Sequence, residues 1–140
     1  MDPDEAERNL RNFMDKIGHP QPFGQYLLQL IDEKDMKDSD VYKNANIDRR
    51  LFSKIRSNPH YHPGKDKVMA LCVGLGLNET EAAQLLARAG YAFSDSSRQD
   101  WAVRWYLQHG DTQVWVLDGL LAELHLPTLT CGARGTCGRQ

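Results

Sequence analysis

Apolar residues recur at intervals of three and four along most of this chain, and this period constrains the fold more than any other feature. The spacing places side chains on one face of an α-helix, whereas a half-buried strand requires strict alternation. We therefore expect an all-α protein. Two stripes show the period clearly: Leu10, Phe13, Met14 and Ile17, and then Phe23, Tyr26, Leu27, Leu30 and Ile31.

The same reasoning divides the chain into successive helices. Residues 97–109 and 113–117 are less regular and are also compatible with a strand. The segment around Gly18, Pro20 and Pro22 separates the first helix from the rest. The expected helices are 4–17, 23–34, 38–44, 49–57, 65–75, a helix opening at 78–81, 97–109 and 112–124.

Capping residues mark where several of these helices begin and end. Asp38 and Asp48 are suitable N-caps for the two short helices. Asn46, between them, can adopt the left-handed conformation that a tight turn after a helix requires. Asn78 and Glu81 have the spacing of a capping box. We therefore expect two short helices joined by a tight turn.

Basic residues are concentrated in one part of the chain. Residues 37–67 contain eight Lys or Arg and four Asp or Glu, so their net charge is +4, although the whole chain has a net charge of -2. The remaining residues therefore carry a net charge of -6. A local basic excess of this kind is the electrostatic footprint that a nucleic-acid-binding surface needs.

The residues of this region resemble a known family. MKDSDVYKNANIDRRLFSKIRS, from Met36 to Ser57, resembles the two-helix core of lambda-repressor-like, xenobiotic-response-element-type regulators. VMALCVGLGLNETEAAQLL, from Val68 to Leu86, resembles their fourth and fifth helices. A weaker similarity continues toward Leu121 and is that of a bacterial subfamily found alone or appended to other domains.

The resemblance implies a lambda-repressor-like five-helix helix-turn-helix core, with an N-terminal helix and a C-terminal helical extension. The corresponding divisions are an N-terminal helical arm at 1–20, the helix-turn-helix domain at 21–92, the helical extension at 93–126 and a flexible tail at 127–140. It also implies a sequence-specific DNA-binding protein, a bacterial transcriptional regulator whose partner is double-stranded DNA.

The 48–57 helix would then enter the major groove. Its apolar residues Leu51, Phe52 and Ile55 face inward, so its other residues face outward. The base-facing candidates are Arg49, Arg50 and Ser53, and the phosphate-contacting candidates are Lys43, Lys54, Arg56, Lys65 and Lys67.

Two residues favour a different interpretation. Tyr42 occupies a position where the family often has a small residue, and the carboxylate of Asp48 would lie close to DNA phosphates. The alternative is a protein-protein interaction module on the same fold that binds no DNA. A positive face broken by Asp38, Asp40 and Asp48 would favour that alternative.

Aromatic residues gather in the C-terminal part of the chain, at Trp101, Trp105, Tyr106 and Trp115. We favour the interpretation that they pack into the core. The other interpretation is an interface, because Trp and Tyr are enriched at interface hot spots, and a homodimer would form through Trp101, Trp105 and Trp115.

The remaining features indicate no catalysis and no cofactor. His60 and His62 have the spacing of a metal-ligand pair but lack a third ligand nearby in sequence, so we expect no metal. No nucleophile or phosphate-loop motif is present, and we expect no enzyme activity. We expect Cys72 to be a reduced thiol in the core, and Cys131 and Cys137 to be exposed thiols. Without an apolar leader or membrane span, we expect a cytoplasmic protein.

Overall fold

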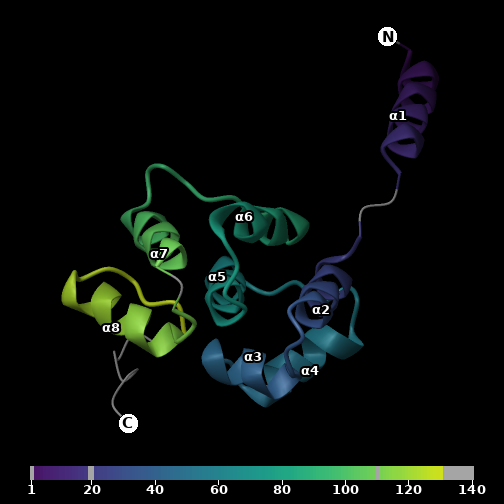
Figure 1. Ribbon diagram of the computed structural model, residues 1–140. Coiled ribbons are helices and arrows are strands. Elements are labelled where there is room, and N and C mark those ends of the chain that lie inside the picture. The colour runs from purple at the N-terminus through teal and green to yellow at the C-terminus, as the bar shows by residue number, and fades with distance from the viewer. Residues whose placement is uncertain (1, 19–20, 110, 131–140) are drawn as a thin grey trace.

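The computed structural model describes residues 2–18, 21–109 and 111–130, and these form eight helices and no strand. The expectation of an all-α protein is confirmed, and the two segments that were also compatible with a strand are helical over residues 98–108 and 114–117. None of the helices in the described ranges is both long and apolar enough to cross a membrane. In chain order they are α1 (Pro3–Ile17), α2 (Phe23–Glu33), α3 (Asp38–Asn44), α4 (Arg49–Ser57), α5 (Lys65–Gly74), α6 (Glu79–Arg88), α7 (Arg98–Gln108) and α8 (Val114–Glu123) (Figure 1).

Helix α5 lies at the centre of the molecule and packs against α3, α6, α7 and α8 (Figure 1). After a charged first turn, its residues from Val68 to Gly74 are all buried, so this part of the helix has no polar face to turn toward solvent. A helical segment that is apolar all round must be enclosed by other helices. Cys72 lies in this helix with none of its surface exposed, which confirms the expected core thiol. Cys131 and Cys137 lie outside the described residues.

Helix α1 differs from all the others, because none of its residues is buried. In the described part of the chain, no other helix packs extensively against it. Figure 1 shows it standing away from α2, on the side of the molecule opposite α7 and α8. Gly18 ends it with a φ of 84°, in the left-handed region that glycine tolerates.

Of the three N-caps expected from the sequence, those of α4 and α6 form as expected and that of α3 differs. Asn78 accepts a hydrogen bond from the Glu81 amide at 2.8 Å, and Glu81 accepts one from the Asn78 amide at 3.1 Å, so the capping box is confirmed. Asp38 was expected to be the N-cap of α3 but is its first helical residue. Lys37 takes the cap position, and its amide donates to Asp40 at 3.4 Å. A carboxylate in the first turn satisfies the same free amides.

The segment after α8 is held to the fold. Leu129 is 2% exposed, and its amide donates to the buried carboxylate of Asp118 at 2.7 Å. The hydroxyl of Thr130 donates to the same carboxylate at 2.7 Å. Residues 129 and 130, at the start of the expected tail, are therefore bound to α8, because its buried carboxylate needs these donors.

Candidate nucleic-acid interface

Helices α3 and α4 meet through a tight turn, and we call residues 38–57 the α3–α4 corner. Asn46 has a φ of 54°, so the expected left-handed turn residue is confirmed. The next residue, Ile47, is buried, and its amide donates to the carbonyl of Tyr42 at 2.8 Å. Asp48 accepts a hydrogen bond from the Arg50 amide at 3.1 Å, which confirms it as the cap of α4. Local residues therefore fix where α3 ends and α4 begins.

The inward face of α4 fixes how the helix is rotated. Phe52 and Ile55 are buried. The backbone of α2 comes so close that a Cβ atom built on Gly24 would lie 2.9 Å from the Ile55 carbonyl oxygen. Glycine at that position lets the two helices touch. The face of α4 opposite Phe52 and Ile55 is therefore directed to solvent.

Tyr42 neither separates the helices of the corner nor projects into solvent. Its ring is partly buried and lies against that of Phe52, with centroids 5.6 Å apart and planes tilted by 50°. The close approach of small residues is found between α3 and α5 and not between α3 and α4. A Cβ atom built on Gly74 would lie 3.0 Å from the Cβ of Ala45. The aromatic side chain fills space between α3 and α4, and the small residues bring α3 onto the core.

The three base-facing candidates share the outward face of α4. Arg49, Arg50 and Ser53 are all exposed. Within the described ranges, neither arginine forms an ion pair with a carboxylate. Two guanidinium groups with free donors at the start of an exposed helix are available for a planar, two-pronged acceptor.

The phosphate-contacting candidates fall into two groups. Lys43, Lys54 and Arg56 are exposed on the α3–α4 corner, and Arg56 pairs with Asp38 at 2.5 Å. Lys65 and Lys67 lie instead in the first turn of α5, beside a hollow that Thr128, Leu129 and Thr130 also line.

The ammonium of Lys65 is already engaged within the fold. It donates to the carboxylate of Asp100 at 2.6 Å. Asp100 is 1% exposed and also accepts a hydrogen bond from the Ser94 amide at 2.7 Å. A buried carboxylate needs a positive partner, so this lysine has a structural role that is not apparent from its place in the sequence.

The acidic residues of the corner are engaged by neighbouring groups. Asp38 pairs with Arg56, Asp40 accepts the Lys37 amide, and Asp48 accepts the Arg50 amide. Each carboxylate offsets a positive charge or a partial positive charge at a helix start. None of these contacts involves the side chains of Arg49, Arg50 or Lys54.

The histidine pair lies apart from the corner. A ring nitrogen of His62 hydrogen-bonds the Ala89 carbonyl, and the ring lies against Tyr91 with centroids 5.4 Å apart. His60 is exposed. In the described ranges, no group of three or more side chains has an arrangement that could hold a metal ion.

The C-terminal tryptophans are not core residues. Trp101, Trp105 and Trp115 are 53%, 51% and 49% exposed, so the favoured packing interpretation is wrong for them, whereas Tyr106 is buried. Helical spacing placed Trp101 and Trp105 on one helix and Trp115 on the next, but it did not show which face of each helix other helices cover.

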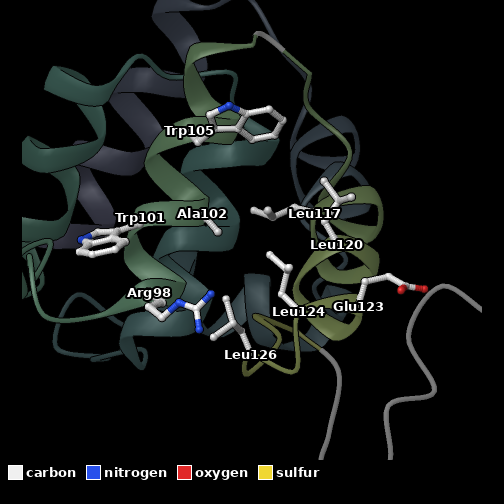
Figure 2. A pocket seen from close by; sticks show the side chains of 9 residues that line it. All are labelled: Arg98, Trp101, Ala102, Trp105, Leu117, Leu120, Glu123, Leu124 and Leu126. Carbon is white, nitrogen blue, oxygen red and sulfur yellow. The ribbon is translucent and has the colours of Figure 1, made fainter.

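Sequence reasoning also missed a groove between α7 and α8. It has a volume of about 470 Å³, and Arg98 and Glu123 flank one end (Figure 2). We call it the α7–α8 groove. Its apolar lining comes chiefly from Trp101, Trp105, Leu117, Leu120, Leu124 and Leu126.

The comparisons with known proteins add no relative. No protein-family model matches the chain, and neither the curated proteins nor the solved structures include a match.

Proposed function

We propose that this protein binds double-stranded DNA in a sequence-specific manner and regulates transcription, as a lambda-repressor-like helix-turn-helix protein. In this proposal α2–α6 form the five-helix core, with α3 and α4 as its helix-turn-helix. Helix α4 lies in the major groove. The single observation that carries the proposal is the pair of exposed arginines, Arg49 and Arg50, that no carboxylate of the described residues engages.

The roles of the side chains follow from their places on the helix. Arg49, Arg50 and Ser53 face base edges, because side chains near the start of such a helix reach deepest into the groove. Arginine pairs two-pronged with the acceptors of guanine. Lys54, one turn after Arg50, and Lys43, on α3, contact phosphates and supply affinity without sequence information.

Of the other three phosphate candidates, Arg56 and Lys65 have to leave or share an existing partner. Arg56 shares its charge with the exposed carboxylate of Asp38, which is a weak surface pair that a phosphate can replace. Lys65 holds the buried carboxylate of Asp100, so we assign phosphate contact on α5 chiefly to Lys67.

The test is binding of labelled random-sequence and genomic duplexes, measured by fluorescence anisotropy at about 50 and about 200 mM salt. The Arg49→Ala/Arg50→Ala protein should bind at least about tenfold more weakly than wild type at both concentrations. The matched control is Arg8→Ala/Arg11→Ala, which removes the same charge from exposed positions on α1. Equal binding by all three proteins, or none by wild type, refutes the proposal.

The second candidate function is a protein-interaction module on this fold, without DNA binding. The half-exposed Trp101, Trp105 and Trp115 favour it, because exposed aromatic clusters are typical of protein interfaces. A pull-down in which Trp105→Ala abolishes capture of a defined partner, while wild type fails to bind duplex DNA, would establish this function instead.

A further inference from the structure

Helix α1 carries an apolar stripe that nothing in the described structure covers. Leu10, Phe13, Met14 and Ile17 are between 57% and 67% exposed. They follow one another at intervals of three, one and three residues, so they form a single ridge along the helix. A ridge of four large apolar side chains in water is typical of a surface that binds a partner.

The α7–α8 groove is the second uncovered apolar surface. Trp105, Leu120 and Leu124 are 51%, 42% and 54% exposed on its two sides (Figure 2). Leu117 is buried at its base. The groove therefore offers Trp105 on its α7 wall, Leu120 and Leu124 on its α8 wall and an apolar floor, and apolar grooves of this kind receive helices.

The ridge and the groove match in pattern and in length. Anchors at positions i, i+3, i+4 and i+7 are the pattern by which an amphipathic helix enters an apolar groove, and Leu10 to Ile17 has that pattern. At 1.5 Å per residue the ridge is about 10 Å long. The apolar α8 wall from Leu117 to Leu124 has the same separation in sequence, and therefore the same length.

Helix α1 does not lie in the groove of its own chain (Figure 1). Residues 18–22 connect α1 to α2 and span at most about 18 Å when fully extended. Helix α2 packs against α4 and α6, and α7 and α8 lie on the far side of α5 (Figure 1). A second molecule, whose α1 is equally uncovered, can supply the ridge for this groove.

We propose that this protein forms a dimer in which α1 of each copy lies in the α7–α8 groove of the other. Each chain has one ridge and one groove, so a reciprocal exchange covers both surfaces in both copies and closes the assembly. This inference does not depend on DNA binding, because it uses no residue of the α3–α4 corner.

The first test is the oligomeric state of the full-length chain, measured by sedimentation velocity across a range of concentrations. Wild type should be a dimer. Phe13→Glu on the ridge and Leu120→Glu in the groove should each weaken dimerisation by about 100-fold or more, because both place a charge in an apolar contact. Asn12→Glu adds the same charge on the opposite, exposed face of α1 and should leave the dimer intact. Circular dichroism should show that all variants retain wild-type helicity.

The second test distinguishes this exchange from direct pairing of two grooves. A mixture of Phe13→Glu and Leu120→Glu proteins contains one intact ridge and one intact groove, so the two should associate with each other more tightly than either does with itself. Fluorescence cross-correlation of the two labelled variants measures this. A wild-type monomer at all concentrations overturns the proposal, as does a dimer that Phe13→Glu leaves unchanged.

Discussion

Replacing Gly74 with alanine should destabilise the protein, although alanine is the better helix former. A Cβ atom there would lie 2.9 Å from the Ala45 amide nitrogen and 3.1 Å from the Val41 carbonyl oxygen. Both are backbone atoms, so relief requires α3 to move away from α5. Overpacking of this kind costs about 1–3 kcal/mol, and the gain in helix propensity of up to about 1 kcal/mol offsets only part of it. We expect a net loss of about 1–2 kcal/mol.

Gly119 provides a matched control for this prediction. It lies inside α8, and a Cβ atom there would meet nothing within 4 Å. Gly119→Ala should therefore stabilise the protein by about 0.5–1 kcal/mol, the ordinary helix-propensity difference. Urea unfolding followed by circular dichroism gives both free energies of unfolding. A Gly74→Ala protein that is as stable as wild type, or more so, refutes the inferred close approach of α3 and α5.

Three further predictions concern single side-chain contacts. Lys65→Met should lower the free energy of unfolding in urea by about 2–3 kcal/mol, because it leaves the buried Asp100 carboxylate without its positive partner. Adding Asp100→Asn should restore part of this loss. The hydrogen bond from Arg104 lowers the pKa of Glu79, so the ionised Glu79 stabilises the fold above the ordinary glutamate pKa, and this contribution disappears as pH falls through the lowered pKa. The difference in free energy of unfolding between wild type and Glu79→Gln should therefore vanish at low pH. A difference that persists there would contradict this assignment. Burial raises the pKa of the Cys72 thiol and keeps reagents away from it. In a variant whose other two cysteines are replaced by serine, iodoacetamide should therefore alkylate Cys72 only as fast as the chain unfolds. Rapid alkylation of the folded protein would contradict the burial of Cys72.

Local sequence was sufficient to predict the helices and the turn between α3 and α4. The features that carried those predictions act over a few residues: Asp48 and the Asn78 capping box start helices, and Asn46 accepts the left-handed conformation. The N-cap of α3 was predicted one residue late, because Asp38 and Asp40 are both acidic residues that a first turn accommodates equally well.

Contacts between distant residues could not be predicted in the same way. Nothing near Lys65 in sequence indicates that its partner is Asp100, and nothing near Asp118 indicates that it holds Leu129. The exposure of Trp105 was missed for the same reason, since helical period identifies a face but not whether a neighbouring helix covers it.

The measurement that tests the central claim most directly is the ratio of affinities for a selected duplex and a scrambled duplex of equal length. If α4 reads bases, wild type should prefer the duplex that it selects from a random pool, and Arg50→Ala should reduce that preference by about 5- to 150-fold. Lys54→Ala should weaken binding to both duplexes alike and lower the salt slope by about one. A wild-type ratio of one, or an Arg50→Ala protein that keeps the wild-type ratio, would contradict the assignment of α4 as a reading helix.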